Sequence, residues 1–301
     1  MMTMINTPKT RGKLLFDVSL SRYNTWGVGG KAQCVFHPAD IEDLSYFLAN
    51  TDADIALTWL GLGSNVLIRD AGIKGIVIVT QTGLKQIRFD GAQSVYAQAG
   101  VACAKLARVT VSKSLVGVEF MAGIPGTVGG ALAMNAGAFG GQTWENVTSV
   151  EVINHRGDIS TRHASEYQYG YRYVESFENE WFVGASFNLE LDEQGTKVVS
   201  IKELLAQRAH SQPIGKKNCG SVFKNPQQGH AASLIEHCGL KGFAIGGACV
   251  SSKHANFIIN EKQATAEDIE VLMEHVQNTV KQQCNIELVP EVKFLGEKVA
   301  I

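Results

Sequence analysis

The sequence predicts a mixed fold of the α/β or α+β class, because segments with strand-like and helix-like patterns alternate along all 301 residues. Apolar residues make up 45% of the chain and charged residues 19%, which is typical of globular rather than disordered proteins. A chain of this length exceeds one compact core, so we expect two or three domains. No repeat of fixed period is visible, which argues against a repeat array.

Local patterns predict the first elements. DIEDLSYFLAN (40–50) carries apolar residues at helical spacing, and GIVIV (75–79) is a β-branched run typical of a buried strand. SVYAQAG (94–100) alternates with period two, and EVINHRGDIS (151–160) has the pattern of a hairpin that turns at HRGD. In WFVGASFNLEL, the alternate residues from Val183 to Leu191 are apolar, which predicts one half-buried strand.

The C-terminal third predicts two helices and a strand. SIKELLAQRAHSQP (200–213) has a helical pattern that ends at its proline. The clearest helix of the chain is expected to begin after a cap at Thr265, with a buried stripe at Ile269, Leu272, Met273, Val276 and Val280. IELVPEVKFLG (286–296) predicts an edge strand, because Pro290 cannot donate a ladder hydrogen bond.

Charge and cysteine content exclude several functional classes. The net charge is −2, from 27 basic and 29 acidic residues, so we expect no nucleic-acid partner. Six scattered cysteines without a C-x-x-C pair are typical of buried free thiols in a reducing compartment, and the histidines lack metal-ligand spacing, so we expect no metal. No signal peptide or membrane-spanning run is visible, so we expect a cytoplasmic protein without membrane insertion. Nothing indicates an obligate protein partner.

Two glycine-rich segments stand out, LGLGSNVLI (60–68) and AGIPGTVGGALAMNAGAFGG (122–141). Seven of the 20 residues of the second segment are glycine and none is charged. Glycine turns can present consecutive backbone N–H groups to an anion, so the segments suit a phosphate held by the main chain. Neither has the spacing of a Walker loop or a complete dinucleotide fingerprint. Tight turns between strands explain the composition equally well, so the glycines alone leave both interpretations open.

Seven motifs in order carry a family resemblance. They are NTWGVGG (24–30), LGLGSNVLI, GIPGTVGGALAMNAGAFG (123–140), YGYR (169–172), GSVFKNP (220–226), SSKHANFIIN (251–260) and ELVPEV (287–292). Together they span roughly Asn24 to Gly296. In this order they resemble the UDP-N-acetylenolpyruvoylglucosamine reductase family, MurB-type flavoenzymes of peptidoglycan synthesis, in their short form.

The resemblance implies an α+β fold: a two-part FAD-binding module of the FAD-linked oxidase (PCMH/VAO) type plus a smaller α+β substrate-binding domain. The expected parts are residues 1–80, to which a C-terminal strand at 286–301 returns, then 81–206, and the substrate domain at 207–285. Neither glycine segment contains His or Cys, so we expect FAD to be held noncovalently. The implied cofactor-binding residues are Gly61, Gly63, Ser64, Asn65, Gly123, Ile124, Gly126, Thr127, Gly129, Gly130, Asn135 and Gly137.

The resemblance also implies the reaction. NADPH is the hydride donor, and the enolpyruvyl ether of UDP-N-acetyl-3-O-(1-carboxyvinyl)-glucosamine is reduced to UDP-N-acetylmuramate. Arg172 matches the family's catalytic arginine, and a guanidinium suits a planar carboxylate. Ser221 matches the proton donor, and Glu291 matches the third catalytic residue. Without the motifs, a surface arginine, a turn serine and an edge-strand carboxylate would be the ordinary interpretations. The implied substrate-binding residues are Tyr171, Arg208 and Asn225.

The sequence also departs from the family pattern. Ser211 stands where many members carry a lysine thought to contact phosphate, and Gly27 replaces a basic residue in the first motif. Arg208, Lys216 or Lys217 are the alternatives for the missing charge. YVES follows Arg172 instead of the usual residues, and the chain lacks the extra loop of longer members. Two other functions therefore stay open, an FAD-dependent oxidase on the same fold and a non-catalytic FAD-binding relative.

Overall fold

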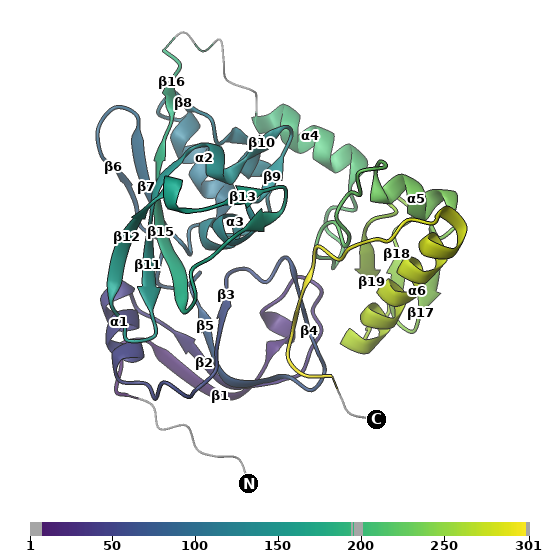
Figure 1. The fold of residues 1–301 in the computed structure, drawn as a ribbon, viewed down its shortest axis with the longest axis horizontal. Coiled ribbons are helices and arrows are strands. Elements are labelled where there is room, and N and C mark those ends of the chain that lie inside the picture. Colours follow the sequence, from purple (N-terminus) through teal and green to yellow (C-terminus); the bar gives the residue numbers. More distant parts are fainter. Residues whose placement is uncertain (1–7, 194, 196–200, 299–301) are drawn as a thin grey trace. The chain divides into compact units, whose positions relative to one another are not determined.

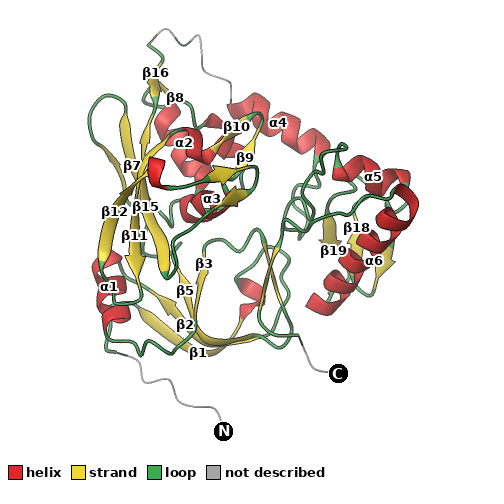
Figure 2. Ribbon diagram, viewed as in Figure 1, coloured by secondary structure: helices red, strands yellow, loops and turns green. Residues whose placement is uncertain are grey.

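The computed structural model describes residues 8–193, 195 and 201–298. The chain divides into two compact units. The first unit comprises the residues up to Phe16, Cys34–Leu62 and Gly75–Ala206, and the second comprises Asp17–Gln33, Gly63–Lys74 and the residues from Gln207 onward. Figure 1 labels the elements, and Figure 2 shows that both units mix helices and strands.

The first sheet of the chain has four strands and packs against one helix. The sheet has the order β1-β2-β5-β3, from Lys13–Ser19, Lys31–His37, Ile73–Val79 and Leu57–Leu60. Helix α1 (Ile41–Ala49) is capped by Asp40, whose carboxylate accepts the Asp43 N–H at 2.9 Å. The predicted apolar face of α1 is confirmed, since Leu44, Phe47 and Leu48 are buried with strand residues such as Phe36.

The main sheet of the first unit has five antiparallel strands in the order β12-β11-β15-β7-β6. They run over Ile159–His163, Val147–Asn154, Glu180–Asn188, Ser94–Gln98 and Ile87–Phe89. The predicted hairpin is confirmed as β11 and β12, which turn between Asn154 and Asp158. Helices α2 (Cys103–Val111) and α3 (Val128–Met134) contribute to the core beside this sheet. In Figure 1 both helices lie on one side of it.

The prediction for Leu191 was wrong. Val183, Ala185, Phe187 and Leu189 are buried as expected, but Leu191 is exposed. Strand β15 ends at Asn188, and the next two residues form β16 (Glu190–Leu191), which pairs with β8 (Leu115–Val116) instead of continuing along β7. A change of partner breaks the period-two alternation, so the apolar face is lost. Two short hairpins complete the strands of the unit, β9 (Gly137–Ala138) with β10 (Gly141–Gln142) and β13 (Tyr169–Gly170) with β14 (Tyr173–Val174).

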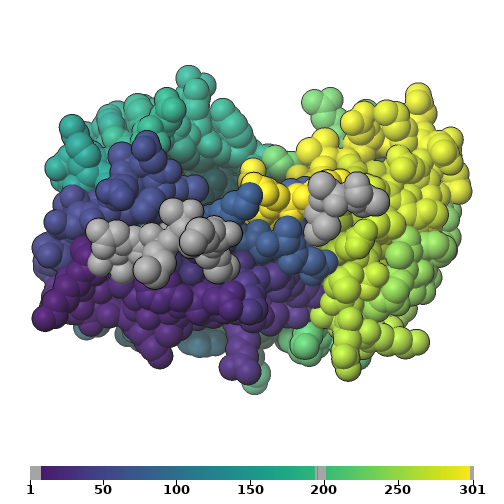
Figure 3. All heavy atoms as spheres, turned by 90° about the horizontal axis from the view of Figure 1, so that it is seen from below, coloured from purple at the N-terminus to yellow at the C-terminus, as the bar shows by residue number. Residues whose placement is uncertain are grey.

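The second unit holds a three-stranded sheet and the longest helix. The sheet order is β17-β18-β19, from Ala244–Ile245, Ala248–Val250 and Ile258–Asn260. Helix α4 (Ile201–Ser211) leads into the unit, α5 (Ala231–His237) follows, and α6 (Ala266–Cys284) is the predicted long helix. Its capping box and the whole predicted apolar stripe are confirmed. In Figure 3 the C-terminal part of this unit, coloured green to yellow, forms one continuous surface.

The C-terminal segment differs from the expected edge strand. Only β20 (Lys293–Leu295) is a strand, and it pairs in parallel with β4 (Val66–Ile68). The preceding residues make a single bridge, between Pro290 and Phe223. Proline has no N–H to donate, which accounts for the missing ladder at this point.

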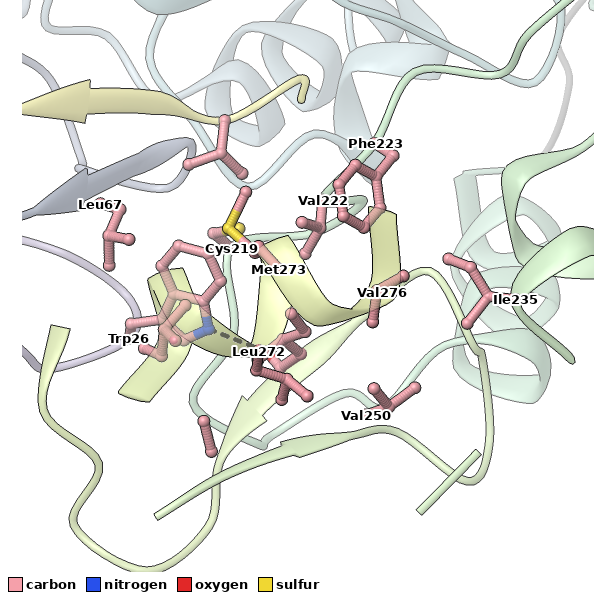
Figure 4. Packing of buried hydrophobic residues seen from close by; sticks show 14 of the residues in the cluster. Trp26, Leu67, Cys219, Val222, Phe223, Ile235, Val250, Leu272, Met273 and Val276 are labelled. Carbon is pink, nitrogen blue, oxygen red and sulfur yellow. Dashed lines mark hydrogen bonds between the residues drawn. The ribbon is translucent and has the colours of Figure 1, made fainter. Parts of the chain in front are cut away.

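Trp26 anchors an early loop in the core of the second unit. Its side chain is fully buried among residues of α6 and the 219–223 segment, as Figure 4 shows. The indole N–H donates to the carbonyl of Ile258 at 2.8 Å, and the Asn260 amide donates to the Trp26 carbonyl at 2.9 Å. The NTWGVGG motif is therefore part of this unit's framework.

The cysteines are all free thiols. Cys34, Cys103 and Cys219 are buried as expected, whereas Cys238, Cys249 and Cys284 are half-buried. Among the described residues, no helix combines the length and apolarity needed to cross a membrane.

An ion pair ties the end of β4 to α6. The Arg69 guanidinium donates from Nε and Nη2 to the two oxygens of Glu270 at 3.0 and 3.1 Å, and from Nη1 to the Gly296 carbonyl. Glu270 also forms an ion pair with Lys298, with Nζ and Oε1 3.1 Å apart. Burial raises the pKa of Glu270, but the bonds from Arg69 and Lys298 outweigh it and hold the pKa below its ordinary value of 4.5.

We predict that Glu270→Ala lowers the free energy of unfolding near neutral pH by about 1.5–3 kcal/mol, because it leaves a half-buried guanidinium without its carboxylate. A carboxyl with a depressed folded-state pKa stabilises the fold above its unfolded pKa. The difference from wild type should therefore shrink as the pH falls below about 4.5. Denaturant unfolding across this range measures it. The exposed pair Lys74–Glu297 is the control, and a Glu297→Ala effect of equal size would contradict the assignment.

Candidate functional site

The two glycine segments meet in the first unit. A Cβ placed on Gly61 would lie 2.4 Å from Oγ1 of Thr127, so only glycine allows this approach. Thr127 is the N-cap of α3, and its hydroxyl accepts the Gly130 N–H at 3.5 Å. Gly129 lies against Ala99, since a Cβ there would come within 2.8 Å of the Ala99 Cβ. The structure therefore brings Gly61, Thr127, Gly129 and Gly130 together.

These four residues line a pocket of about 410 Å³. The rest of its wall comes from residues that the motifs do not include: Trp59, Leu60, Thr80, Ala99, Ala133, Ser176, Phe177, Asn179, Glu180, Trp181 and Phe182. Trp59 and Trp181 stack with ring centroids 5.1 Å apart. Trp59 directly precedes the first glycine segment, but no sequence signal marks Trp181, which lies on strand β15 outside both segments.

The pocket wall has hydrogen-bond donors without protein partners among the described residues, and its one carboxylate is neutralised by an arginine. The Trp59 indole Nε1 is buried without a partner among the described residues. The backbone N–H group of Gly61, which also lines the pocket, makes no hydrogen bond with any residue that the structure describes. Glu180, the one carboxylate of the pocket wall, is paired with Arg162 at 2.6 Å. Main-chain donors next to an aromatic wall fit a flavin dinucleotide, whose pyrophosphate needs donors and whose rings need flat apolar contacts.

The remaining predicted cofactor residues do not line this pocket. Gly123, Ile124 and Gly126 lie in the turns before α3, where Gly123 contacts the Phe139 ring. Gly137 opens β9. Asn135 is almost fully buried in the left-handed conformation, and its amide donates to Gln142 and to the Gly170 carbonyl, each at 2.9 Å. Gly63, Ser64 and Asn65 belong to the second unit.

Arg172 sits at the turn of the β13–β14 hairpin. Its backbone is left-handed, with φ +54°, which is uncommon for a non-glycine residue. Its Nη2 donates to the Gly137 carbonyl at 2.8 Å, so the guanidinium contacts the second glycine segment within the first unit. Tyr171 is 54% exposed, and its ring centroid lies 5.2 Å from the guanidinium carbon.

The second unit brings Ser221 and Glu291 onto neighbouring segments. The Glu291 N–H donates to the Val222 carbonyl at 2.8 Å, and the Lys224 N–H donates to the Val289 carbonyl at 2.9 Å. The Asn65 amide donates to the Glu291 carbonyl at 3.0 Å. Burial, and then the negative charge of Glu291, raise the pKa of the Cys219 thiol well above its ordinary value, so this neighbour stays neutral.

The Ser221 hydroxyl is available to a ligand. Ser221 is half-buried, and its Oγ makes no hydrogen bond with another described residue. The residue before it, Gly220, has φ +81° and open space where a Cβ would stand. Asn225 is exposed, and its Oδ1 accepts the Ala231 N–H at the start of α5, which leaves its amide donors toward solvent.

Two basic side chains, Arg208 and Lys217, lie in the second unit near the positions where the sequence departs from the family pattern. Burial lowers the pKa of Arg208, whose Nε donates to Gln212 at 2.8 Å and which pairs with no carboxylate among the described residues. Lys217 lies over Gly27, because a Cβ there would be 3.4 Å from the lysine Nζ. Ser211 is exposed and bonds back to the Gln207 carbonyl. No cluster of three or more possible metal ligands occurs in the described part of the chain.

Two family models and several curated relatives match most of the chain. Residues 32–162 match the family model described as FAD binding domain, and residues 212–295 match that of the UDP-N-acetylenolpyruvoylglucosamine reductase C-terminal domain. A UDP-N-acetylenolpyruvoylglucosamine reductase of Legionella pneumophila is 50% identical over 290 residues, covering 96% of this chain and 94% of that protein. One from Coxiella burnetii is 49% identical over 310 residues, covering 97% and 98%.

A solved structure matches as well. The crystal structure of the reductase (MurB) from Thermus caldophilus superposes with a TM-score of 0.81 at 30% identity, covering 96% of this chain and all of that one. With the domain matches, it confirms the predicted fold class, an FAD-binding module plus a smaller α+β domain. The chain belongs to the UDP-N-acetylenolpyruvoylglucosamine reductase family.

Proposed function

We propose that this chain is a UDP-N-acetylenolpyruvoylglucosamine reductase, an FAD-dependent enzyme that uses NADPH to form UDP-N-acetylmuramate in peptidoglycan synthesis. The observation that carries the proposal is 50% identity to a reductase of this name over 96% of the chain. The pocket and the Ser221–Glu291 arrangement support it from the geometry. Because NADPH and UDP-sugars are cytoplasmic metabolites, we place the reaction in the cytoplasm, without an obligate protein partner.

FAD, when bound, accepts a hydride from NADPH and delivers a hydride to the vinyl carbon of the substrate. In our proposal the cofactor-binding residues are those of the two glycine segments, with Trp59 and Trp181 added as an aromatic wall. The chain holds the cofactor through main-chain donors, so FAD is noncovalent. Residues 1–80 and 81–206 form the cofactor module in this proposal, and 207–285 bind the sugar. The matched family models, over 32–162 and 212–295, support only the border between the cofactor module and the C-terminal part, and segments 17–33 and 63–74 belong to the same compact unit as the latter.

In the proposal, Arg172 stabilises the negative charge that develops on the substrate. Hydride addition to the vinyl group leaves carbanion character next to the substrate carboxylate, and a guanidinium binds a planar carboxylate through two donors. Its contact with Gly137 and the hydrogen-bonded hairpin beneath it hold the side chain in place before substrate arrives. Tyr171, exposed beside it, is the proposed contact to the sugar.

Ser221 supplies the proton that completes the reduction. The hydride forms a C–H bond at the terminal vinyl carbon, which leaves the electron pair of the double bond on the carbon next to the carboxylate. That carbon then takes the proton, so one hydride and one proton together saturate the double bond. Serine is a weak acid, but a carbanion is a strong base. A hydroxyl without a protein partner among the described residues can point its proton at that carbon.

Phosphate recognition falls to the cations of the second unit. Arg208 is half-buried without a carboxylate partner in the described part of the chain, which is an uncommon state unless an anion completes it. Lys217 occupies the space over Gly27, where the family motif has a basic side chain. We propose that these two residues replace the lysine missing at position 211, and that Asn225 contacts the sugar through its amide.

The proposed function predicts two separable half-reactions. Under anaerobic conditions NADPH should bleach the bound flavin, and the UDP-enolpyruvyl sugar should then restore its absorbance, whereas acid precipitation should release the flavin. An oxidase would be reoxidised by oxygen and not by the sugar, and a non-catalytic relative would not be bleached. Either result would overturn the proposal, and flavin retained in the precipitate would refute noncovalent binding alone.

We predict that Ser221→Ala slows substrate reduction by roughly 10²–10⁴-fold, the usual contribution of a general acid, while flavin reduction by NADPH stays near the wild-type rate. Only the second step needs the proton. Stopped-flow absorbance measures the two steps separately. Equal slowing of both would assign Ser221 a structural role instead.

We predict that Glu291→Gln keeps far more turnover than Glu291→Ala. Two adjacent carboxylates do not both stay ionised in a partly dry site, so in our proposal Glu291 is protonated beside the substrate carboxylate and donates a hydrogen bond. Glutamine retains a donor and the shape, whereas alanine loses a donor worth roughly 10²–10³ in rate. Steady-state kinetics with flavin content as the control measures both variants. Equal damage would favour an ionised Glu291 that orients Arg172.

A further inference from the structure

Asn256 replaces a main-chain partner for the segment after Ser221. It is 3% exposed, and its side-chain amide pairs with both backbone groups of Phe223. The Phe223 N–H donates to Oδ1 at 3.0 Å, and Nδ2 donates to the Phe223 carbonyl at 2.8 Å. The Val222 N–H also donates to the Asn256 carbonyl at 2.9 Å. One residue thus makes three hydrogen bonds with the two residues that directly follow Ser221.

The opposite edge of this segment is bonded to the residues around Glu291. Val222 accepts the Glu291 N–H, and Lys224 donates to Val289, but Pro290 between them has no N–H to offer. Residues 222–224 therefore lie between the Asn256 amide and residues 289–291. Figure 4 shows the Val222 and Phe223 side chains in the apolar core, where both are buried.

On the other side of Ser221, a single glycine separates the serine from Cys219, which is buried in the core of the second unit. Gly220 has φ +81°, no atoms lie within 4 Å of the point where its Cβ would stand, and its N–H bonds to the Asn218 side chain at 3.0 Å. The Ser221 Oγ has no protein partner of its own among the described residues. Because Gly220 is a permissive link, the direction of the hydroxyl depends on the backbone that follows it, and Asn256 holds that backbone together with Val289 and Glu291.

We infer that Asn256 is a positioning residue for the reduction step: it holds Val222 and Phe223 so that Ser221 and Glu291 keep a fixed separation. This inference rests on the proposed function. Asn256 itself is buried and acts through the backbone of the 222–224 segment. A shift of about 1 Å in a reacting group costs on the order of 100-fold in rate, so a small loosening here is enough to matter.

The test is a double-mutant cycle on the two half-reactions, measured by anaerobic stopped flow with the flavin-loaded enzyme. We expect Asn256→Ala to slow reoxidation by the UDP-enolpyruvyl sugar roughly 10- to 100-fold, with flavin reduction by NADPH little changed. In the Ser221→Ala background the same substitution should cost less than about threefold, because the group it positions is gone. Thr265→Ala, which removes the cap of α6 in the same unit, is the stability control and should leave both rates unchanged.

The outcomes separate the inference from the function on which it rests. If wild type fails to reoxidise with the sugar, the proposed function fails and takes the inference with it. If wild type reacts but Asn256→Ala slows both half-reactions equally, or costs the same with and without Ser221, Asn256 is structural and the inference is overturned. Should Asn256→Ala lose its flavin or unfold, Asn256→Asp goes through the same cycle. It keeps the shape and the acceptor for the Phe223 N–H and lacks the donor.

Discussion

The hydrogen bond from the Trp26 indole to the Ile258 carbonyl joins residues 232 positions apart. A buried indole N–H costs free energy unless it finds an acceptor, so this bond selects one arrangement of the early loop in the second unit. The Asn260 amide closes the same contact from the other side. Segments 17–33 and 63–74 belong to this unit and contribute Trp26, Val28 and Leu67 to its core. A fragment from Gln207 onward would therefore lack part of its own core.

Buried asparagine amides recur in two of the family motifs of this unit, NTWGVGG and SSKHANFIIN. Asn24 donates to the Leu20 and Val28 carbonyls and accepts the Gly27 N–H, so one side chain closes the whole NTWGVGG turn. Asn260 and Asn256 instead bond to other segments, Asn260 to the Trp26 carbonyl and Asn256 to the backbone of Phe223. An amide side chain offers the same donor and acceptor as a peptide group, so it can satisfy irregular backbone where no strand is available. These motif residues therefore build the framework on which the proposed catalytic groups stand.

Sequence patterns predicted the parts of the fold that local periodicity determines. The stripe of α6 is confirmed because a helix meets its core through its own spacing. Leu191 was mispredicted because its face depends on which strand it pairs with, and pairing is not local. The glycine segments were found from composition, but Trp59 and Trp181 come from separate strands that only the fold brings together. The role inferred for Asn256 likewise depends on a partner 33 residues away in the sequence.

The bond at Trp26 also orders events during synthesis on the ribosome. At roughly 5–20 residues per second, the 232 residues between Trp26 and Ile258 take about 10–50 s to add. During that interval the Trp26 indole lacks its acceptor and most of the core that buries it, and β4 waits still longer for β20 at Lys293–Leu295. The five-stranded sheet of the first unit, built from residues 87–188, can close earlier, since all its strands are made before Ile258. A translating chain therefore leaves the Trp26 indole without its acceptor until Ile258 has been made, so the second unit closes around its earliest segment only late in synthesis.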